Sequence, residues 1–245
     1  EARIVLLKKG YDNAQLNLFW MSLSTDYFLQ NSVDAIVWHT ELLWPPGKSI
    51  SEMHVELRED PVHRCTELFV YGPDRDDLFA HSAALLNQLG LNILSARIQT
   101  TVQGLSINTY LVLEEDGSRI RGEERLTGIR YFLEDGLNSA EPPLGAPRMP
   151  RQLKSFQMPS QIGFEQDETR MVTLLMLLTS DRPGLLSMVG QVFAAGKLRL
   201  HFARIATAGA EAQDTFAITD RDDQPISDPE RLAAIAEALR SKLDD

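Results

Sequence analysis

The chain contains one segment twice, and this repeat limits the folds that it can adopt. Residues 74–100 read DRDDLFAHSAALLNQLGLNILSARIQT, and residues 181–207 read DRPGLLSMVGQVFAAGKLRLHFARIAT. The copies align without a gap; both begin with Asp-Arg-x-x-Leu and end with Ala-Arg-Ile-x-Thr. Their separation is much longer than the repeat unit of a solenoid protein. The pattern therefore predicts two copies of a small domain.

Composition and charge narrow the functional classes. A chain of 245 residues with 43% hydrophobic side chains can build the cores of two or three small domains. The net charge of −11 argues against nucleic acid or an anionic membrane as the main partner, since both attract clustered Lys and Arg. The longest mainly apolar run, 171–178, has the length of a strand, whereas a membrane helix needs about 20 residues. The single Cys65 forms no internal disulfide, which fits a cytoplasmic protein.

The N-terminal part of the chain is predicted to be helical. It starts at Glu1 without a signal-peptide pattern, and we interpret it as the continuation of a longer protein. Within 12–43, apolar residues recur at helical spacing, and Ser32 is a candidate N-cap for a further helix. The sequence Pro45-Pro46-Gly47 ends this region.

From Glu52 the apolar period changes to two, with Met53, Val55 and Leu57 alternating as in a half-buried strand. In the first domain, the pattern then predicts a strand at 66–72 and a helix at 76–89 that ends at Gly90. Strands at 92–101 and 107–113 and a helix at 123–137 follow. Residues 151–168 predict one or two short strands. The second copy repeats the order, with a strand at 170–179, a helix at 184–195, strands at 198–207 and 213–219, and a helix at 228–243.

This order predicts an α+β fold with two ferredoxin-like units in tandem, each an antiparallel sheet with both helices on one face. The second copy ends on a helix, so its last strand must come from elsewhere, either from 53–57 or from within 153–166. We expect a helical segment at 1–47, a first domain at 50–138, a Pro-, Ala- and Gly-rich linker at 139–151 and a second domain at 152–245.

The turn after the first strand of each copy carries the main binding motif. In the second copy it reads Asp181-Arg182-Pro183-Gly184, with Asp181 well placed to cap the helix that follows. Helix N-termini bind carboxylates, because their amides are unsatisfied and the dipole is positive there. Taken alone, the tetrapeptide is better explained as a plain capped helix start. Its pairing with Ala-Arg-Ile-x-Thr, in duplicate, makes a binding role more specific.

Both copies resemble ACT domains, small ferredoxin-like modules that bind amino acids and regulate enzymes. The resemblance covers about 66–137 and 170–243. Upstream, Trp20, Asp26-Tyr27-Phe28-Leu29 and Ile36-Val37-Trp38-His39-Thr40 resemble the segment before the tandem ACT domains of the bifunctional uridylyltransferase/uridylyl-removing enzymes, which modify the nitrogen-signalling protein PII. The run Asp214-Thr215-Phe216-Ala217-Ile218-Thr219-Asp220 also resembles that family.

In that family a nucleotidyltransferase domain attaches UMP to PII, a metal-dependent HD domain removes it, and the ACT pair senses glutamine. The sequence has neither a Gly-Ser with paired aspartates nor an adjacent His-Asp dyad. The resemblance thus implies a regulatory region without catalytic residues, metal or cofactor of its own. The Mg²⁺ or Mn²⁺ would belong to the parent enzyme, and residues 1–47 would end its HD-type domain. The implied partners are L-glutamine or another amino acid, and PII through the parent.

The resemblance places the ligand loops at 74–79 and 181–186, facing the strands that begin at 92 and 199. It implies these ligand-binding residues: Asp74, Arg75, Asp76, Asp77, Leu78, Asn92, Ile93, Asp181, Arg182, Pro183, Gly184, Leu185, Leu186, Arg199 and Leu200. An aspartate of either loop would meet the ligand ammonium, and Asn92 would pair with a ligand amide or main chain.

The two copies differ at these positions. Asp76-Asp77 replaces Pro-Gly in the first copy, and Lys197 and Arg199 replace Gly90 and Asn92 in the second. We therefore expect unequal sites, with the better backbone cradle at Pro183-Gly184 and the better strand side at Asn92. One composite site between the domains would combine both.

Other residues carry weaker signals. The five histidines show no metal-ligand spacing, Arg97 and Arg204 are expected to pair with carboxylates at a sheet edge, and the aromatic residues of 19–38 are expected in a core or interface.

Two functional alternatives stay open. One is an interaction or dimerisation module that binds no ligand, since exposed sheet edges pair easily. The other, less favoured, is an independent enzyme with an unrecognised site.

Overall fold

A computed structural model describes residues 1–45, 50–75, 77–139, 158–182, 184–208 and 210–244. Most of the expected linker and the candidate residues Asp76 and Pro183 lie outside these ranges. The predicted domain boundaries stay a prediction.

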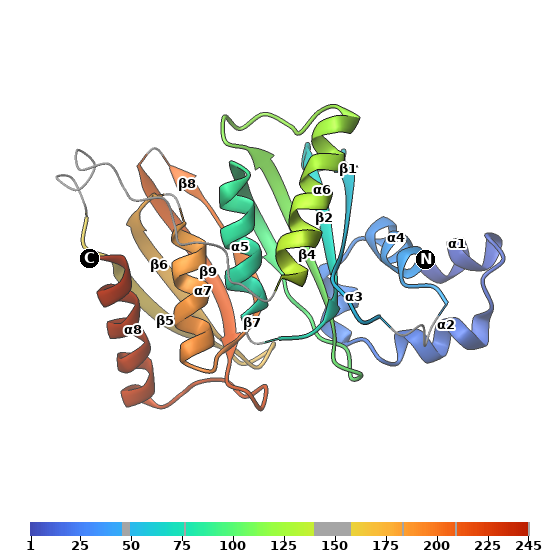
Figure 1. The fold of residues 1–245 in the computed structure, drawn as a ribbon. Helices are drawn as coiled ribbons and strands as arrows, with labels where there is room; N and C mark the ends of the chain where they lie inside the picture. Colours follow the sequence, from blue (N-terminus) through green and yellow to red (C-terminus); the bar gives the residue numbers. More distant parts are fainter. Residues whose placement is uncertain (46–49, 76, 140–157, 183, 209, 245) are drawn as a thin grey trace.

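Four short helices precede the sheet (Figure 1): α1 (Ala2–Lys8), α2 (Asn13–Trp20), α3 (Thr25–Gln30) and α4 (Val33–Leu42). Polar side chains begin three of them. Asp12, Ser24 and Ser32 each accept a hydrogen bond from a backbone amide in the first turn of α2, α3 and α4. The predicted cap at Ser32 is confirmed. Helix α1 lies before the residues that the apolar pattern predicted as helical.

All described strands belong to one antiparallel sheet. Its order is β1-β2-β4-β3-β7-β9-β6-β5, with β8 paired to β9. The strands are β1 (His54–Asp60), β2 (Cys65–Pro73), β3 (Leu91–Arg97), β4 (Leu105–Glu114), β5 (Gln161–Asp167), β6 (Val172–Ser180), β7 (Arg199–Arg204), β8 (Thr207–Ala208) and β9 (Glu211–Thr219). Four helices lie on one face of it (Figure 1): α5 (Leu78–Gln88), α6 (Glu123–Asn138), α7 (Leu185–Ala195) and α8 (Pro229–Leu243).

The sheet divides into two four-stranded halves, β1-β2-β4-β3 and β5-β6-β9-β7, which confirms the α+β prediction of tandem ferredoxin-like units. In each half the outer strand precedes the repeated segment. Strand β5 completes the second half, so the alternative that the strand near 53–57 would do so is wrong. That strand, β1, pairs with β2, because only a short turn at 61–64 separates them.

Alternation along β2 places two cores on opposite faces of the sheet. Leu68 and Val70 pack in the core under the helices α5 and α6, whereas Phe69 and Tyr71 pack with residues of α1–α4. The first half of the sheet is therefore covered on both faces.

The two halves join side by side. Ser95–Arg97 of β3 pair with Phe202–Arg204 of β7, and the ladder continues with Ile98 N to His201 O at 2.9 Å and Ile205 N to Leu94 O at 3.0 Å. Helices α5 and α7 lie next to each other above this junction (Figure 1). This arrangement brings the first helical turn of each copy close to a strand of the other.

Candidate functional site

A pocket of about 280 Å³ lies at the junction, between the start of α7 and strand β3. The second copy contributes Asp181, Arg182, Gly184, Leu185 and Leu186, and the first copy contributes Asn92 and Ile93. The structure thus brings the Gly184 loop and Asn92, predicted as the better halves of two separate sites, into one pocket.

The equivalent pocket, on the other side of the junction, is smaller, at about 70 Å³. The remaining predicted residues Asp74, Arg75, Leu78, Arg199 and Leu200 line it. Asp77 lines neither pocket among the described contacts; its carboxylate lies 3.2 Å from Arg75 Nε in an ion pair. The two pockets therefore differ in size, while the predicted inequality of the two ligand sites stays a prediction.

The loop residues do not act as helix caps, contrary to the expectation for Asp181. Helix α7 begins after Gly184, whose φ of 79° is left-handed, and no described side chain caps it. The chain needs this left-handed residue to enter the helix, so Asp181 lies too early to reach the first-turn amides. Asp74 instead accepts a hydrogen bond from Thr100 Oγ1 at 2.9 Å.

The amide of Gly184, expected to bind a ligand carboxylate, already has a partner. It donates to Asn87 Oδ1, on α5 of the other copy, at 3.0 Å. Similarly, Asn92 is exposed, and its Nδ2 donates to the Glu115 carbonyl at 3.1 Å. A ligand would have to displace these amide side chains or bind beside them.

Sequence reasoning missed the most unusual pocket residue, Asp214. It lies in β9 in the same inward-facing row as Ala212 and Phe216, and only 2% of its surface is exposed. Its Oδ1 accepts a hydrogen bond from Ala206 N at 3.3 Å. Its Oδ2 is buried and has no hydrogen-bond partner among the described residues. A polar residue in an otherwise apolar alternating row is the sequence signal that could have revealed it.

Strand register identifies the counterpart of Asp214 in the first copy. Asp214 pairs with Leu177 and Asn108 pairs with Val70, which are equivalent positions of the repeat. Asn108 is fully buried and lines the smaller pocket. Its Oδ1 accepts hydrogen bonds from Ser106 Oγ at 3.0 Å and from Gln99 N at 3.3 Å. The larger pocket therefore contains a carboxyl group at the position where the smaller pocket contains a neutral amide.

Burial shifts the charges of the larger pocket. It raises the pKa of Asp214 to about 7, with the nearby negative charge of Asp181 adding to the effect and the Ala206 amide opposing it. Burial also lowers the pKa of the Arg182 guanidinium, whose Nε has no hydrogen-bond partner in the described part of the chain. In this pocket, burial therefore disfavours the charged forms of both Asp214 and Arg182.

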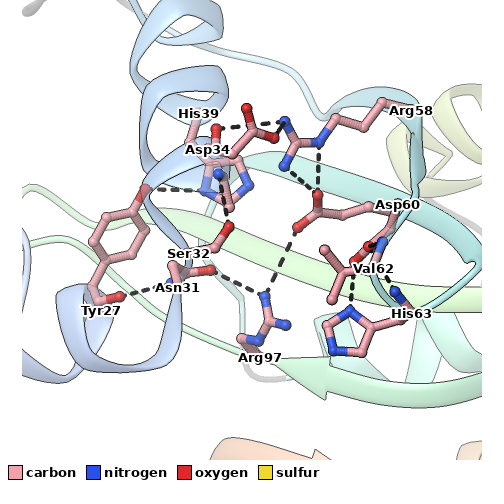
Figure 2. A network of polar contacts seen from close by, with 12 residues as sticks. Tyr27, Asn31, Ser32, Asp34, His39, Arg58, Asp60, Val62, His63 and Arg97 are labelled. Carbon is pink, nitrogen blue, oxygen red and sulfur yellow. Dashed lines mark hydrogen bonds and ion pairs between the residues drawn. The ribbon is translucent and has the colours of Figure 1, made fainter. Parts of the chain in front are cut away.

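A polar network connects the N-terminal helices to the first half of the sheet (Figure 2). Glu67 is 3% exposed and lies between Arg58, at 2.6 Å, and Arg97, at 3.9 Å. Arg58 also reaches Asp34 of α4 at 2.8 Å, and Arg97 Nη1 donates to Asn31 Oδ1 at 3.1 Å. Arg97 does pair with a carboxylate as predicted, but β3 is no sheet edge, because β7 pairs with it.

The aromatic residues of the same region are packed as predicted. The His39 ring stacks on Phe69 with 4.0 Å between ring centres, and Tyr27 Oη lies 3.0 Å from His39 Nδ1. Burial, with the positive charges of Arg58 and Arg97, keeps the pKa of His39 well below its usual value. His39 therefore belongs to a neutral packing interface.

The described residues contain no group of three or more His, Cys, Asp or Glu side chains arranged to hold a metal ion. Their helices are also all too short or too polar to cross a bilayer.

Known sequences relate the chain to one family. Residues 1–42 match the family model of the uridylyltransferase GlnD fifth domain. The bifunctional uridylyltransferase/uridylyl-removing enzyme of Pseudomonas putida is 37% identical over 244 residues, which are 98% of this chain and 27% of the relative. By sequence, the chain corresponds to the C-terminal part of the bifunctional uridylyltransferase/uridylyl-removing enzymes. Relatives of the same name from Azotobacter vinelandii and Pseudomonas syringae pv. tomato are 37% and 36% identical, at the same coverage.

The chain spans about a quarter of the length of these curated relatives. Among solved structures, an unknown protein from Galdieria sulphuraria covers 78% of the chain with a TM-score of 0.24 and 13% identity, a likeness too weak to argue from.

Proposed function

We propose that this chain is the amino-acid-sensing region of a PII uridylyltransferase/uridylyl-removing enzyme, and that L-glutamine is its ligand. Binding would control the addition of UMP to PII and its removal by the catalytic parts of the parent. The observation that carries the proposal is the composite pocket, lined by the Gly184 loop of one copy and strand β3 of the other. A ligand there contacts both ACT domains at once and can thus report its presence through their arrangement.

The pocket offers the chemistry that an α-amino acid requires. Asp181 and Asp214 are acceptors for an ammonium group, and Arg182 together with the start of α7 can hold a carboxylate. Asn87 and Asn92 present amide groups suited to a side-chain amide. A volume of about 280 Å³ suits a small metabolite better than a nucleotide cofactor or a peptide.

Regulation requires that the ligand bind two states of the parent enzyme with different affinity. The Glu67 network supports a route for this, since it attaches α3 and α4 to β1, β2 and β3, and β3 also lines the pocket. A shift of the two copies relative to each other at β3 would therefore also move the N-terminal helices.

Isothermal titration of the chain with L-glutamine tests the proposal, with L-glutamate as the control ligand. We expect heat from glutamine and a higher unfolding temperature, because a ligand at 100 times its Kd stabilises the folded state by about 2.7 kcal/mol. Neither ligand should bring UMP transfer or removal by this chain alone.

An absence of heat and of thermal shift at millimolar glutamine would contradict the proposal. If the same samples formed dimers to the same extent with and without amino acids, an interaction module that binds no ligand would explain the chain better. Strands β1 and β5, which end the sheet formed by the described residues, would then be the first surfaces to examine.

A further inference from the structure

We propose that Asp214 selects a ligand with a positively charged amino group in the larger pocket, and that such a ligand releases a proton from this carboxyl group when it binds. The inference rests on the proposed function, because it assumes an amino acid as the occupant. It adds a selecting residue and a dependence on pH.

The position of Asp214 is not explained by folding alone. The side chain lies in the apolar row of β9, next to Ala212 and Phe216, and a buried polar oxygen without a partner costs free energy. Such exceptions need a reason, and Oδ2 is an acceptor in a residue that lines a pocket of 280 Å³. A bound ammonium would give this oxygen the partner that the described residues do not supply.

The other charges of the pocket leave this role to Asp214. Among the described lining residues the ionisable groups are Asp181, Arg182 and Asp214; α5, β3 and β4 contribute only neutral side chains. Asp181 is exposed, so its attraction for a cation is screened by water. Arg182 has the charge that suits the ligand carboxylate. The buried Asp214 carboxylate, in a less polar environment, attracts a cation more strongly.

The smaller pocket serves as an internal comparison. It has the same construction, but Asn108 replaces the acid, and both Asn108 Oδ1 and Asp74 Oδ2 already accept hydrogen bonds. Arg75 and Arg199 add positive charge there. An ammonium ligand should therefore prefer the larger pocket, with one ligand bound per chain.

The proton balance follows from the charge states. Without ligand, Asp214 is partly protonated near neutral pH, since burial raises its pKa to about 7. The ammonium stabilises the carboxylate, so the Asp214 O–H bond breaks and the proton passes to the solvent, while the ligand nitrogen keeps its three hydrogens. Binding should weaken as the pH falls below about 7, by up to tenfold per pH unit.

Titration calorimetry of the 245-residue chain can measure this coupling. L-glutamine is titrated at pH 6, 7 and 8, each in two buffers with different ionisation enthalpies, so that the difference in heat counts the protons released. A second probe, 4-carbamoylbutanoate, is glutamine without its α-amino group. We expect a release of about half a proton at pH 7. We also expect glutamine to bind up to about tenfold more tightly at pH 8 than at pH 6. The probe without the amino group should bind at least about tenfold more weakly than glutamine at pH 8.

Two variants complete the test. Asp214→Asn has nearly the same shape and copies the residue found in the other pocket, so it should fold; its unfolding temperature checks this. It should bind glutamine at least tenfold more weakly at pH 8 and release no proton. Asp135→Asn changes an exposed acid of α6 and should behave like the unchanged chain.

The outcomes separate the two proposals. Three results would overturn the role of Asp214 and leave the proposed function standing. They are tight glutamine binding without proton release, equal binding of glutamine by Asp214→Asn, and binding of 4-carbamoylbutanoate as tight as that of glutamine. No binding by the unchanged chain would overturn both.

Discussion

At the scale of single residues, Asp214 should lower the folding stability of the ligand-free protein at pH values above about 7. Its carboxyl group has an ordinary pKa of 3.8 when unfolded and about 7 when folded, so it binds its proton more tightly in the folded state. Its contribution to stability is fully present below pH 3.8 and is lost as the pH rises to about 7. Above that pH the buried charge costs up to about 4 kcal/mol.

We therefore predict that Asp214→Asn raises the free energy of unfolding at pH 8 by about 1–3 kcal/mol, with a smaller gain at pH 5. Urea unfolding of both proteins at the two pH values measures this. The ligand is left out, so the result concerns stability alone. A variant that is less stable than the unchanged chain at both pH values would show that Asp214 is satisfied in the folded state.

Single residues were also where sequence reasoning was weakest. The motif around Asp181 was recognised, but its capping role was wrong, because the position of a cap depends on the left-handed turn at Gly184. Asp214 lies in the run 214–220 that resembles the family, but the sequence alone does not mark it as a site residue. Its significance depends on burial and on the pairing of β9, which the sequence does not show directly.

At the scale of elements, helices α5 and α7 of the two copies pack closely against each other at Gly190. A Cβ added at Gly190 of α7 would lie 2.7 Å from the Cα of Ala80 in α5, where neither backbone can easily move. Gly128 of α6 has no atom within 4 Å of such a Cβ, so it is a matched control in another helix.

We predict that Gly190→Ala lowers the free energy of unfolding by about 1–3 kcal/mol, because overpacking outweighs the better helix propensity of Ala. Gly128→Ala should raise it by about 0.5–1 kcal/mol. Chemical denaturation of the two variants checks both values. Equal stabilisation by the two substitutions would mean that α5 and α7 are not in close contact.

Most elements could be predicted from the sequence, because alternation and helical spacing reflect burial on one face. Both helices of each copy and their strands lie where the apolar period placed them, within a few residues. Helix α1 falls inside the helical segment expected at 1–47, although it lies before the residues with helical apolar spacing. The pattern did not predict β8, which has only two residues. It also could not choose the last strand of the second copy, since pairing is decided by the length of the connecting turns.

At the scale of the whole molecule, the side-by-side pairing of β3 and β7 forms the composite pocket. The repeat predicted two similar domains, but not which edges they share, since many edges of two such sheets can pair. That choice places the Gly184 loop opposite Ile93 and creates a site that neither copy has alone.

One ligand at this junction should contact both copies, and hydrogen–deuterium exchange with and without L-glutamine can detect this contact. We predict slower exchange in two segments far apart in sequence, 184–189 at the start of α7 and 91–95 in β3, with a smaller effect at 77–82. Protection in neither segment at saturating glutamine, or in only one of them, would contradict a composite site between the two copies.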